Sequence, residues 1–223
     1  FSVFSNQFLV AQLHKMLNAE TVEEMHASKE ILANELGVVF SKGHSNDVLE
    51  SADGLEGEGL VGLEGSVDGS VFRFEAAHFE WLVSLANNIG VEFSEMGRRS
   101  HGASKTLHFC DELIRLYGSE QFAIASAASY AVENWAAAGF WEELISGLKI
   151  FKQKNKLDKF PLAFFTWHSK LEANHAHHTQ QEIEEYFFTH EVDEDSFIQY
   201  GNEMLDGVAV FWEGLYESRN GLH

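Results

Sequence analysis

The chain has 223 residues, 45% of them hydrophobic and 13% aromatic, and this composition predicts a single globular domain over residues 1–223. With 35 acidic residues against 15 basic ones, the formal net charge of −20 argues against binding to nucleic acids and to membranes with anionic lipids. A single cysteine, Cys110, excludes an internal disulfide and fits a reducing compartment, so we expect a cytoplasmic location.

Helical periodicity dominates the chain, and a single proline leaves room for long helices. The pattern predicts an all-α bundle of seven helices, at about residues 4–18, 21–40, 71–89, 103–117, 119–152, 160–189 and 193–218. Residues 45–70 are rich in glycine and acidic residues, and we expect a long surface loop there, with a β-hairpin as the less favoured alternative. The apolar run at 122–141 is interrupted by Glu133 and Asn134 and is interpreted as a buried core helix, not a membrane span.

The segment 164–178, FFTWHSKLEANHAHH, contains four histidines and a glutamate in a helical pattern. At about 100° per residue, His168, Glu172 and His175 fall within an arc of roughly 60° around the helix axis. Their side chains therefore point toward one place, whereas His177 and His178 point elsewhere. A lone histidine on a helix is usually structural, but an acid and two imidazoles on one face favour a metal site.

Other helices carry groups of the same chemistry. Glu133 lies among small residues of a helix expected to be buried, where an unpaired carboxylate costs roughly several kcal/mol. It therefore needs a proton, a hydrogen bond, a base or a cation. Glu75 and His78 are three residues apart and share a face of the helix expected at 71–89. Glu35 on the second helix is a weaker candidate. A lone glutamate on a helix is usually a residue at the edge of the core or a partner in a salt bridge, and this is the favoured interpretation of Glu35.

The ligand types indicate which metal to expect. Carboxylate and imidazole groups without thiolate argue against structural zinc and suit iron, with manganese as the alternative. Six protein ligands are too many for one catalytic ion that keeps an open position. Divided between two ions they leave room for O2 and a substrate, and helix bundles are where carboxylate-bridged di-iron sites are built.

These residues resemble the pattern of the haem-oxygenase-like di-iron oxidases, a family with the TenA/PqqC-like fold that includes the CADD protein and alkene-forming fatty-acid decarboxylases. The family pattern is a Glu and a His close together on one helix, a Glu on a later helix, and then His-x3-Asp-x2-His. In this chain the pattern maps, over about residues 5–215, onto the metal ligands Glu75, His78, Glu133, His168, Glu172 and His175.

The resemblance implies a seven-helix haem-oxygenase-like bundle that uses two Fe²⁺ ions and O2 to cleave C–C bonds or oxidise amine nitrogens of fatty-acid-like or amino-acid-like substrates. One departure is Glu172, which stands where the family has Asp and adds about 1.5 Å of reach. Ferritin-like di-iron proteins offer a rival arrangement that uses Glu35 in place of His168. The use of His168 and the segment SYAVENWAAAGFW favour the haem-oxygenase-like fold.

A small-molecule substrate is the expected partner, and a homodimer is an open option. Aromatic residues near the ligands in sequence are candidates for lining the substrate pocket, namely Tyr130, Trp135, Phe164 and Trp167. A pocket of this kind favours an aromatic or long apolar molecule. Three arginines are candidates for holding a substrate carboxylate, namely Arg73, Arg98 and Arg99.

Three other functions stay open at the level of sequence. The first is a TenA-like hydrolase with Cys110 as nucleophile, although the segment LHFCDEL offers that thiol no evident activating group. The second is a non-catalytic bundle that stores metal or binds a partner protein. The third is a haem-binding protein with one histidine as axial ligand.

Overall fold

The structure, a computed structural model, describes residues 1–42, 63–67, 70–74, 76–189, 191–219 and 221. For residues 39–42, 63–67, 70–74, 171–178, 181, 182, 185 and 189 the description covers the backbone alone. The described part of the chain contains eight α-helices, which are α1 (Ser2–Leu17), α2 (Val22–Glu35), α3 (His78–Asn87), α4 (Ser104–Tyr117), α5 (Phe122–Trp135), α6 (Trp141–Lys154), α7 (Ala163–Thr189) and α8 (Glu194–Arg219). The prediction of an α-helical bundle is therefore confirmed.

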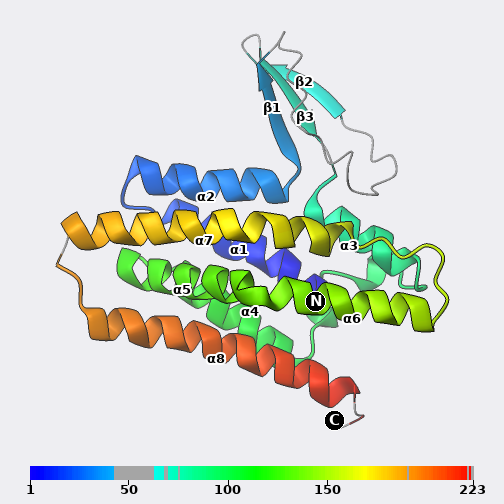
Figure 1. Cartoon of the computed structure of the whole chain (residues 1–223). Helices are drawn as coiled ribbons and strands as arrows, with labels where there is room; N and C mark the ends of the chain where they lie inside the picture. The colour runs from blue at the N-terminus through cyan, green and yellow to red at the C-terminus, as the bar shows by residue number, and fades with distance from the viewer. Residues whose placement is uncertain (43–62, 68–69, 75, 190, 220, 222–223) are drawn as a thin grey trace.

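The helices pack around a shared apolar core. α8 packs along α4 and α5, α1 packs against α4 and α2, and α7 packs against α5, α6 and α3. Figure 1 shows α2 and α8 on opposite sides of the bundle, with α7 and α5 between them. Several core side chains have no exposed surface, namely Leu113, Leu116 and Tyr117 of α4 and Met204 of α8. Since burying one such apolar side chain contributes about 1.5–3 kcal/mol, the contact between α4 and α8 anchors the bundle.

The apolar run at 122–141 begins with α5, and the small residues of this helix are buried. Ala127 and Ala128 have no exposed surface, and Ser129 is 1% exposed. Small side chains let the neighbouring helices approach α5 closely, so the interpretation as a buried core helix is confirmed. Within the described part of the chain, no helix combines the length and the apolar character needed to cross a bilayer.

The helix expected at 119–152 is interrupted after α5 by a π-helical segment, η4 (Ala136–Phe140). Inside η4, Ala138 and Gly139 leave helical backbone angles, and Gly139 has a φ of +96°, which glycine adopts without the steric cost of a Cβ. The chain then continues as α6. Segments of this kind are frequent at functional sites, and η4 begins three residues after Glu133.

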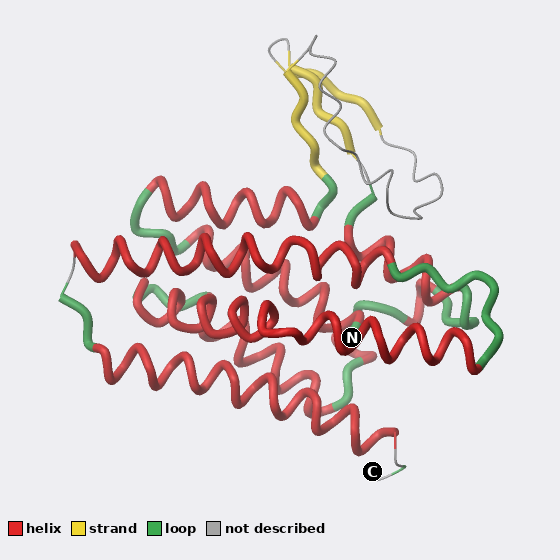
Figure 2. The backbone as a smooth tube through the Cα atoms, in the orientation of Figure 1, coloured by secondary structure: helices red, strands yellow, loops and turns green. Residues whose placement is uncertain are grey.

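A three-stranded antiparallel sheet lies between α2 and α3 in the sequence. Its strands are β1 (Val38–Lys42), β2 (Leu63–Val67) and β3 (Ser70–Phe74), in the order β1-β3-β2. Figure 2 shows the strands extending away from the helices. The sheet is an addition to the expected all-α bundle. The antiparallel pair β2–β3 corresponds to the less favoured alternative of a β-hairpin near residues 45–70, whereas β1 was not predicted.

The sheet corrects the predicted boundaries in this region. The second helix ends at Glu35 and not at residue 40, and the third begins at His78 and not at residue 71. Residues 63–67, expected to be loop, form a strand, while 43–62 lie outside the described residues. The missed signal is the dipeptide Asp68-Gly69, which is typical of two-residue hairpin connections. In the pairing of β2 with β3, Val67 lies opposite Ser70, so the paired ends of the two strands are separated by two residues in the sequence.

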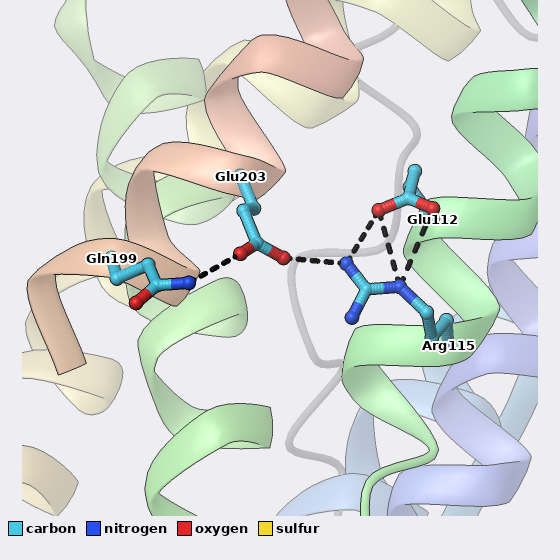
Figure 3. Close-up of polar contacts among 4 residues, drawn as sticks. All are labelled: Glu112, Arg115, Gln199 and Glu203. Carbon is cyan, nitrogen blue, oxygen red and sulfur yellow. Dashed lines mark hydrogen bonds and ion pairs between the residues drawn. The ribbon is translucent and has the colours of Figure 1, made fainter. Parts of the chain in front are cut away.

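A polar network at the surface joins α4 to α8 (Figure 3). Nη2 of Arg115 lies 2.6 Å from Oε2 of Glu203, and the same guanidinium pairs with Glu112 on its own helix. The Gln199 amide donates to Glu203 at 2.9 Å. Together the Gln199 and Arg115 contacts hold the pKa of Glu203 below its usual range.

Replacing Arg115 by Ala should lower the free energy of unfolding by about 0.5–1 kcal/mol at neutral pH, because partly exposed ion pairs contribute little each. The pKa of Glu203 is lowered in the folded protein. Its contribution to the free energy of unfolding is therefore present above its ordinary pKa and is lost as the pH falls. The difference between the variant and the wild type should therefore shrink below about pH 4. Urea unfolding at neutral and acidic pH measures this, with exposed Arg219→Ala as control. An unchanged difference in acid would contradict the assignment.

Candidate metal centre

Glu35 of α2, His78 of α3 and His168 of α7 bring their polar side-chain atoms to one point in the protein interior. One ligand atom from each residue lies within 4.8 Å of those of the other two. Oε1 of Glu35 is 3.0 Å from Nδ1 of His78 and 3.4 Å from Nε2 of His168. The three side chains are only 5–11% exposed, so bulk water does little to screen the charge of this cluster.

The sheet holds two of these residues at neighbouring positions. Antiparallel pairing of β1 with β3 sets Val38 opposite Phe74. These paired residues lie three positions after Glu35 and four positions before His78. Gly37, with a φ of +69°, ends α2 and turns the chain into β1. The end of α2 and the start of α3 are therefore held together by backbone pairing.

The ring of His168 is oriented by its own helix. Its Nδ1 lies 2.6 Å from the carbonyl oxygen of Phe164 and, because a carbonyl only accepts, Nδ1 carries the proton. Nε2 then faces Oε1 of Glu35, and a lone pair on Nε2 repels the carboxylate unless a proton or a cation lies between them. Metal-binding histidines commonly donate their other ring N–H in this way, which fixes the tautomer.

Tryptophan rings pack against both histidines. Trp141 stacks on His168, with ring centroids 5.0 Å apart and planes at 30°. Trp81 stacks on His78, with centroids 4.8 Å apart and planes at 24°. The two imidazoles are themselves 4.9 Å apart. These contacts hold both rings in place and surround the polar cluster with apolar surface.

The distances within the cluster suit a transition-metal ion. Two ligands that bind one ion at roughly 2.1 Å, at angles of about 90–109°, are separated by about 3.0–3.4 Å. The contacts of Glu35 with the two histidines fall in this range. The contact between Nδ1 of His78 and Oε1 of Glu35 fits two states of the cluster, an ion pair with a protonated imidazole or two ligands of one metal ion.

The electrostatics of Glu35 also favour a nearby cation. Burial acts to raise its pKa, but the contacts with His168 and His78 outweigh burial and hold the pKa well below its usual range. Glu35 is also the last residue of α2, where the helix dipole adds negative potential. A buried anion at this position requires a positive partner, either a protonated imidazole or a metal ion.

Of the ligands expected from the sequence, the structure places three near the cluster. His78 and His168 belong to it. Glu133 is 5% exposed and lines the same cavity as Glu35 and His168. The sequence analysis rated Glu35 as the weaker candidate, although its position among apolar residues just before a helix-ending glycine was a usable signal.

The other three predicted ligands cannot be placed in the same way. Glu75 lies outside the described residues, as do the side chains of Glu172 and His175. The reason given for Glu75 needs correction, since α3 begins at His78 and the two residues before it are not helical. The helix on which a shared face was predicted therefore starts at His78, and it does not extend over residues 76 and 77.

A cavity opens beside the cluster, and Glu35, Glu133 and His168 form part of its wall. The cavity measures about 80 Å³, where one water molecule needs roughly 10–15 Å³. Most of the wall is apolar and much of it is aromatic, including Phe4, Phe8, Trp135, Trp141, Phe164 and Trp212. The cluster thus has room beside it for part of a small molecule with apolar surface.

The predicted substrate-contacting residues divide between two places. Trp135 and Phe164 line the cavity, whereas Tyr130 and Trp167 do not. Trp167 contacts the cluster through His78, with ring centroids 6.4 Å apart, and its ring centroid is 5.9 Å from that of Trp81.

The arginines considered for a substrate carboxylate are not in the described wall of the cavity. Arg99 is 44% exposed and pairs with Asp111 at 2.6 Å. Arg98 is exposed, and the side chain of Arg73 lies outside the description.

Cys110 lacks the surroundings of a nucleophile. Its side chain has no exposed surface, it does not line the cavity, and burial raises the pKa of its thiol to about 11.

In the native protein Cys110 should react with iodoacetamide at pH 8 on the order of 100-fold more slowly than in urea, because little thiolate forms. Mass spectrometry of quenched samples measures this rate. Equal rates would restore Cys110 as a candidate nucleophile.

Comparison with known proteins does not assign the chain to a family. No protein-family model matches it, no curated protein matches it, and no solved structure matches it. The geometry of the cluster and its cavity is therefore the basis on which a function can be inferred.

Proposed function

We propose that this protein is a non-haem, iron-dependent oxidoreductase that consumes O2, with Glu35, His78 and His168 as ligands of one iron ion. The observation that carries the proposal is a buried carboxylate and two imidazoles beside an aromatic cavity. Oxygen and nitrogen ligands without thiolate favour iron or manganese over structural zinc. Three protein ligands also leave coordination positions for O2 and for a substrate.

A second iron ion completes the proposed centre. Glu133 lines the same cavity as His168 and is 5% exposed. Positions 172 and 175 follow 168 along the continuous helix α7, and residues at this spacing share a helix face. We assign Glu133, Glu172 and His175 to the second ion, while Glu35 takes the place that the sequence pattern gave to Glu75.

The proposed fold is the haem-oxygenase-like bundle. The rival ferritin-like scheme uses Glu35 and not His168, and the cluster contains both residues. The cluster thus combines a ligand of each scheme, and the haem-oxygenase-like bundle is proposed because both His168 and the segment SYAVENWAAAGFW match the pattern of that family. The sheet formed by β1, β2 and β3 is then an insertion that also sets the distance between Glu35 and His78.

When bound, iron would supply the activation of O2. The side chains of the chain supply charge, orientation and exclusion of water. Glu35 contributes negative charge that offsets part of the charge of the ion. The hydrogen bond from His168 to the Phe164 carbonyl keeps Nε2 directed at the site. Trp141 and the other aromatic residues of the wall limit access of water to the reacting end of a substrate.

A mononuclear iron oxygenase is a second candidate, favoured by one specific observation. Two histidines and one carboxylate are the ligand set of mononuclear non-haem Fe(II) oxygenases. These are also the groups that lie within 4.8 Å of one another among the described residues. The two candidates differ in the number of iron ions that the protein binds.

Anaerobic reconstitution with Fe²⁺, followed by metal analysis and mixing with O2, tests the proposal. Two equivalents of iron and a transient visible absorption on mixing support the di-iron oxidase. One equivalent together with O2 consumption supports the mononuclear oxygenase. Iron that binds without any O2 consumption points to storage, and a sharp Soret band after addition of hemin points to haem binding. Either of these last results contradicts the proposed function.

A further inference from the structure

All five tryptophans of the chain belong to one network of aromatic rings around the metal cluster. Trp141 stacks on His168, with ring centroids 5.0 Å apart. Trp81 and Trp167 lie beside His78, at 4.8 Å and 6.4 Å between ring centroids. Indole is among the side-chain groups that lose one electron most easily. Tryptophans in contact with the ligands of a redox-active metal are therefore candidates for electron transfer.

A chain of rings leads from Trp141 toward the surface. The ring centroid of Phe140 is 4.9 Å from that of Trp141. Phe140 also contacts Trp135 at 4.4 Å and Trp212 at 5.3 Å, again between centroids. Trp141 is 6% exposed, whereas Trp135 and Trp212 are only partly buried. The buried ring beside the ligand is therefore joined, through one phenyl ring, to two tryptophans that water reaches.

We propose that the rings of Trp141, Phe140, Trp135 and Trp212 form an electron relay, through which oxidising equivalents leave the metal centre for the surface when no substrate is bound. The inference rests on the proposed function, in which O2 oxidises iron bound beside His168. Without a substrate, the side chains around the iron are the groups exposed to oxidation, His168 among them. A relay that removes oxidising equivalents through indole rings protects the ligand set.

One electron moves in each step of the relay. Trp141 gives an electron to the oxidised iron and takes one from Trp135 or Trp212 across Phe140. The outer ring then loses its indole proton to water and is left as a neutral radical. A thiol in solution returns one electron and one proton to that ring, and two of the resulting thiyl radicals combine as a disulfide. The net result is oxidation of thiol in place of oxidation of the protein.

The surroundings of the rings set the direction of the relay. An indole that has lost an electron is positively charged and acidic. Nε1 of Trp141 is buried and has no hydrogen-bond partner among the described residues, so no group there takes its proton. An apolar site disfavours the charged ring, which therefore takes an electron from a neighbour. Trp135 and Trp212 are partly exposed, so water accepts their indole proton and the oxidising equivalent stays on the outer rings.

Peptide mapping by mass spectrometry tests the relay, because radicals on tryptophan leave hydroxytryptophan and kynurenine derivatives. The whole chain is loaded with Fe²⁺ under anaerobic conditions, mixed with O2 without substrate or thiol, and digested. Trp141→Phe keeps an aromatic ring beside His168 but removes the oxidisable one, and Trp141→Tyr restores an oxidisable ring of nearly the same shape. Trp81 and Trp167 lie outside the relay and serve as internal controls in every sample.

In the wild type we expect oxidation products on Trp135 or Trp212. In Trp141→Phe these products should fall to the level found in the metal-free protein, because the path between them and the iron is broken. Oxidation of His168 to 2-oxohistidine should rise in the same variant. Trp141→Tyr should restore the wild-type pattern, which a purely structural role of the tryptophan does not predict.

Two results overturn the relay. Equal oxidation of Trp135 and Trp212 in the wild type and in Trp141→Phe shows that oxidants reach these rings from solution. An equal loss of products in Trp141→Phe and Trp141→Tyr shows that packing and not electron transfer is responsible, and so does a matching loss at Trp81 and Trp167.

A second variant keeps the test decisive if Trp141→Phe does not fold. Phe140→Leu removes the bridging ring and leaves Trp141 in place, so it should also lower the products on Trp135 and Trp212, and unchanged products overturn the inference. Iron content and O2 consumption are measured on the same samples, and a chain that binds no iron contradicts both proposals. Iron that binds without O2 consumption contradicts the proposed function alone, because H2O2 in place of O2 still oxidises the iron and the comparison of variants still tests the relay.

Discussion

Replacing His168 by Ala should weaken binding of Fe²⁺ by on the order of 100-fold or more, since a three-residue ligand set loses one of its two imidazoles. His168 is well placed for a large effect. Its Nε2 lies 3.4 Å from Oε1 of Glu35, and its Nδ1 is held by the Phe164 carbonyl. Loss of the ring leaves the carboxylate with His78 as its remaining partner within the cluster.

Anaerobic titration with Fe²⁺ measures the loss, and thermal unfolding gives a second measure. Iron at about 100 times its dissociation constant should raise the Tm of the wild type by roughly 5–10 °C and leave that of His168→Ala almost unchanged. His168→Asn, which can still donate to the Phe164 carbonyl, separates loss of the ligand from loss of packing. His108→Ala removes an exposed histidine of α4 and should behave as wild type. Full affinity in both His168 variants would exclude this residue as a ligand.

The helical part of the site was predictable because helix periodicity is a local property of the sequence. His168 and Glu133 were singled out from their positions on single helices, and the structure buries both beside one cavity. The division between α5 and α6 was not predicted, because the alanines of η4 suit a continuous helix and only Gly139 marks the break.

The role of Glu35 depends on contacts between distant parts of the chain. Nothing near Glu35 in the sequence indicates that β1 pairs with β3 and thereby brings it to His78. The same pairing explains why the third helix begins later than expected, since residues that alternate along a strand were interpreted as a turn of helix. Local pattern therefore singled out His78, His168 and Glu133, whereas the pairing of β1 with β3 holds Glu35 close to His78.

Replacing Glu35 by Ala should abolish high-affinity binding of Fe²⁺, whereas Glu75→Ala should change the affinity by less than about threefold. Glu35 provides the carboxylate of the cluster, and its removal leaves two imidazoles without the anion that offsets the charge of the ion. A loss on the order of 100-fold or more is expected for Glu35→Ala. Glu30→Ala, at an exposed position of the same helix, is the matched control.

Comparison of Glu35→Ala with Glu75→Ala decides which of the two carboxylates binds the metal ion together with His78. The sequence pattern places Glu75 in the site through a shared helix face with His78, but α3 begins only at His78. Glu35 approaches the same histidine to 3.0 Å. If Glu75→Ala loses as much iron affinity as Glu35→Ala, both acids bind metal and the ligand set inferred from the sequence is restored. If Glu75→Ala alone loses it, Glu35 is only an ion-pair partner of the two histidines, and the centre must be rebuilt around Glu75.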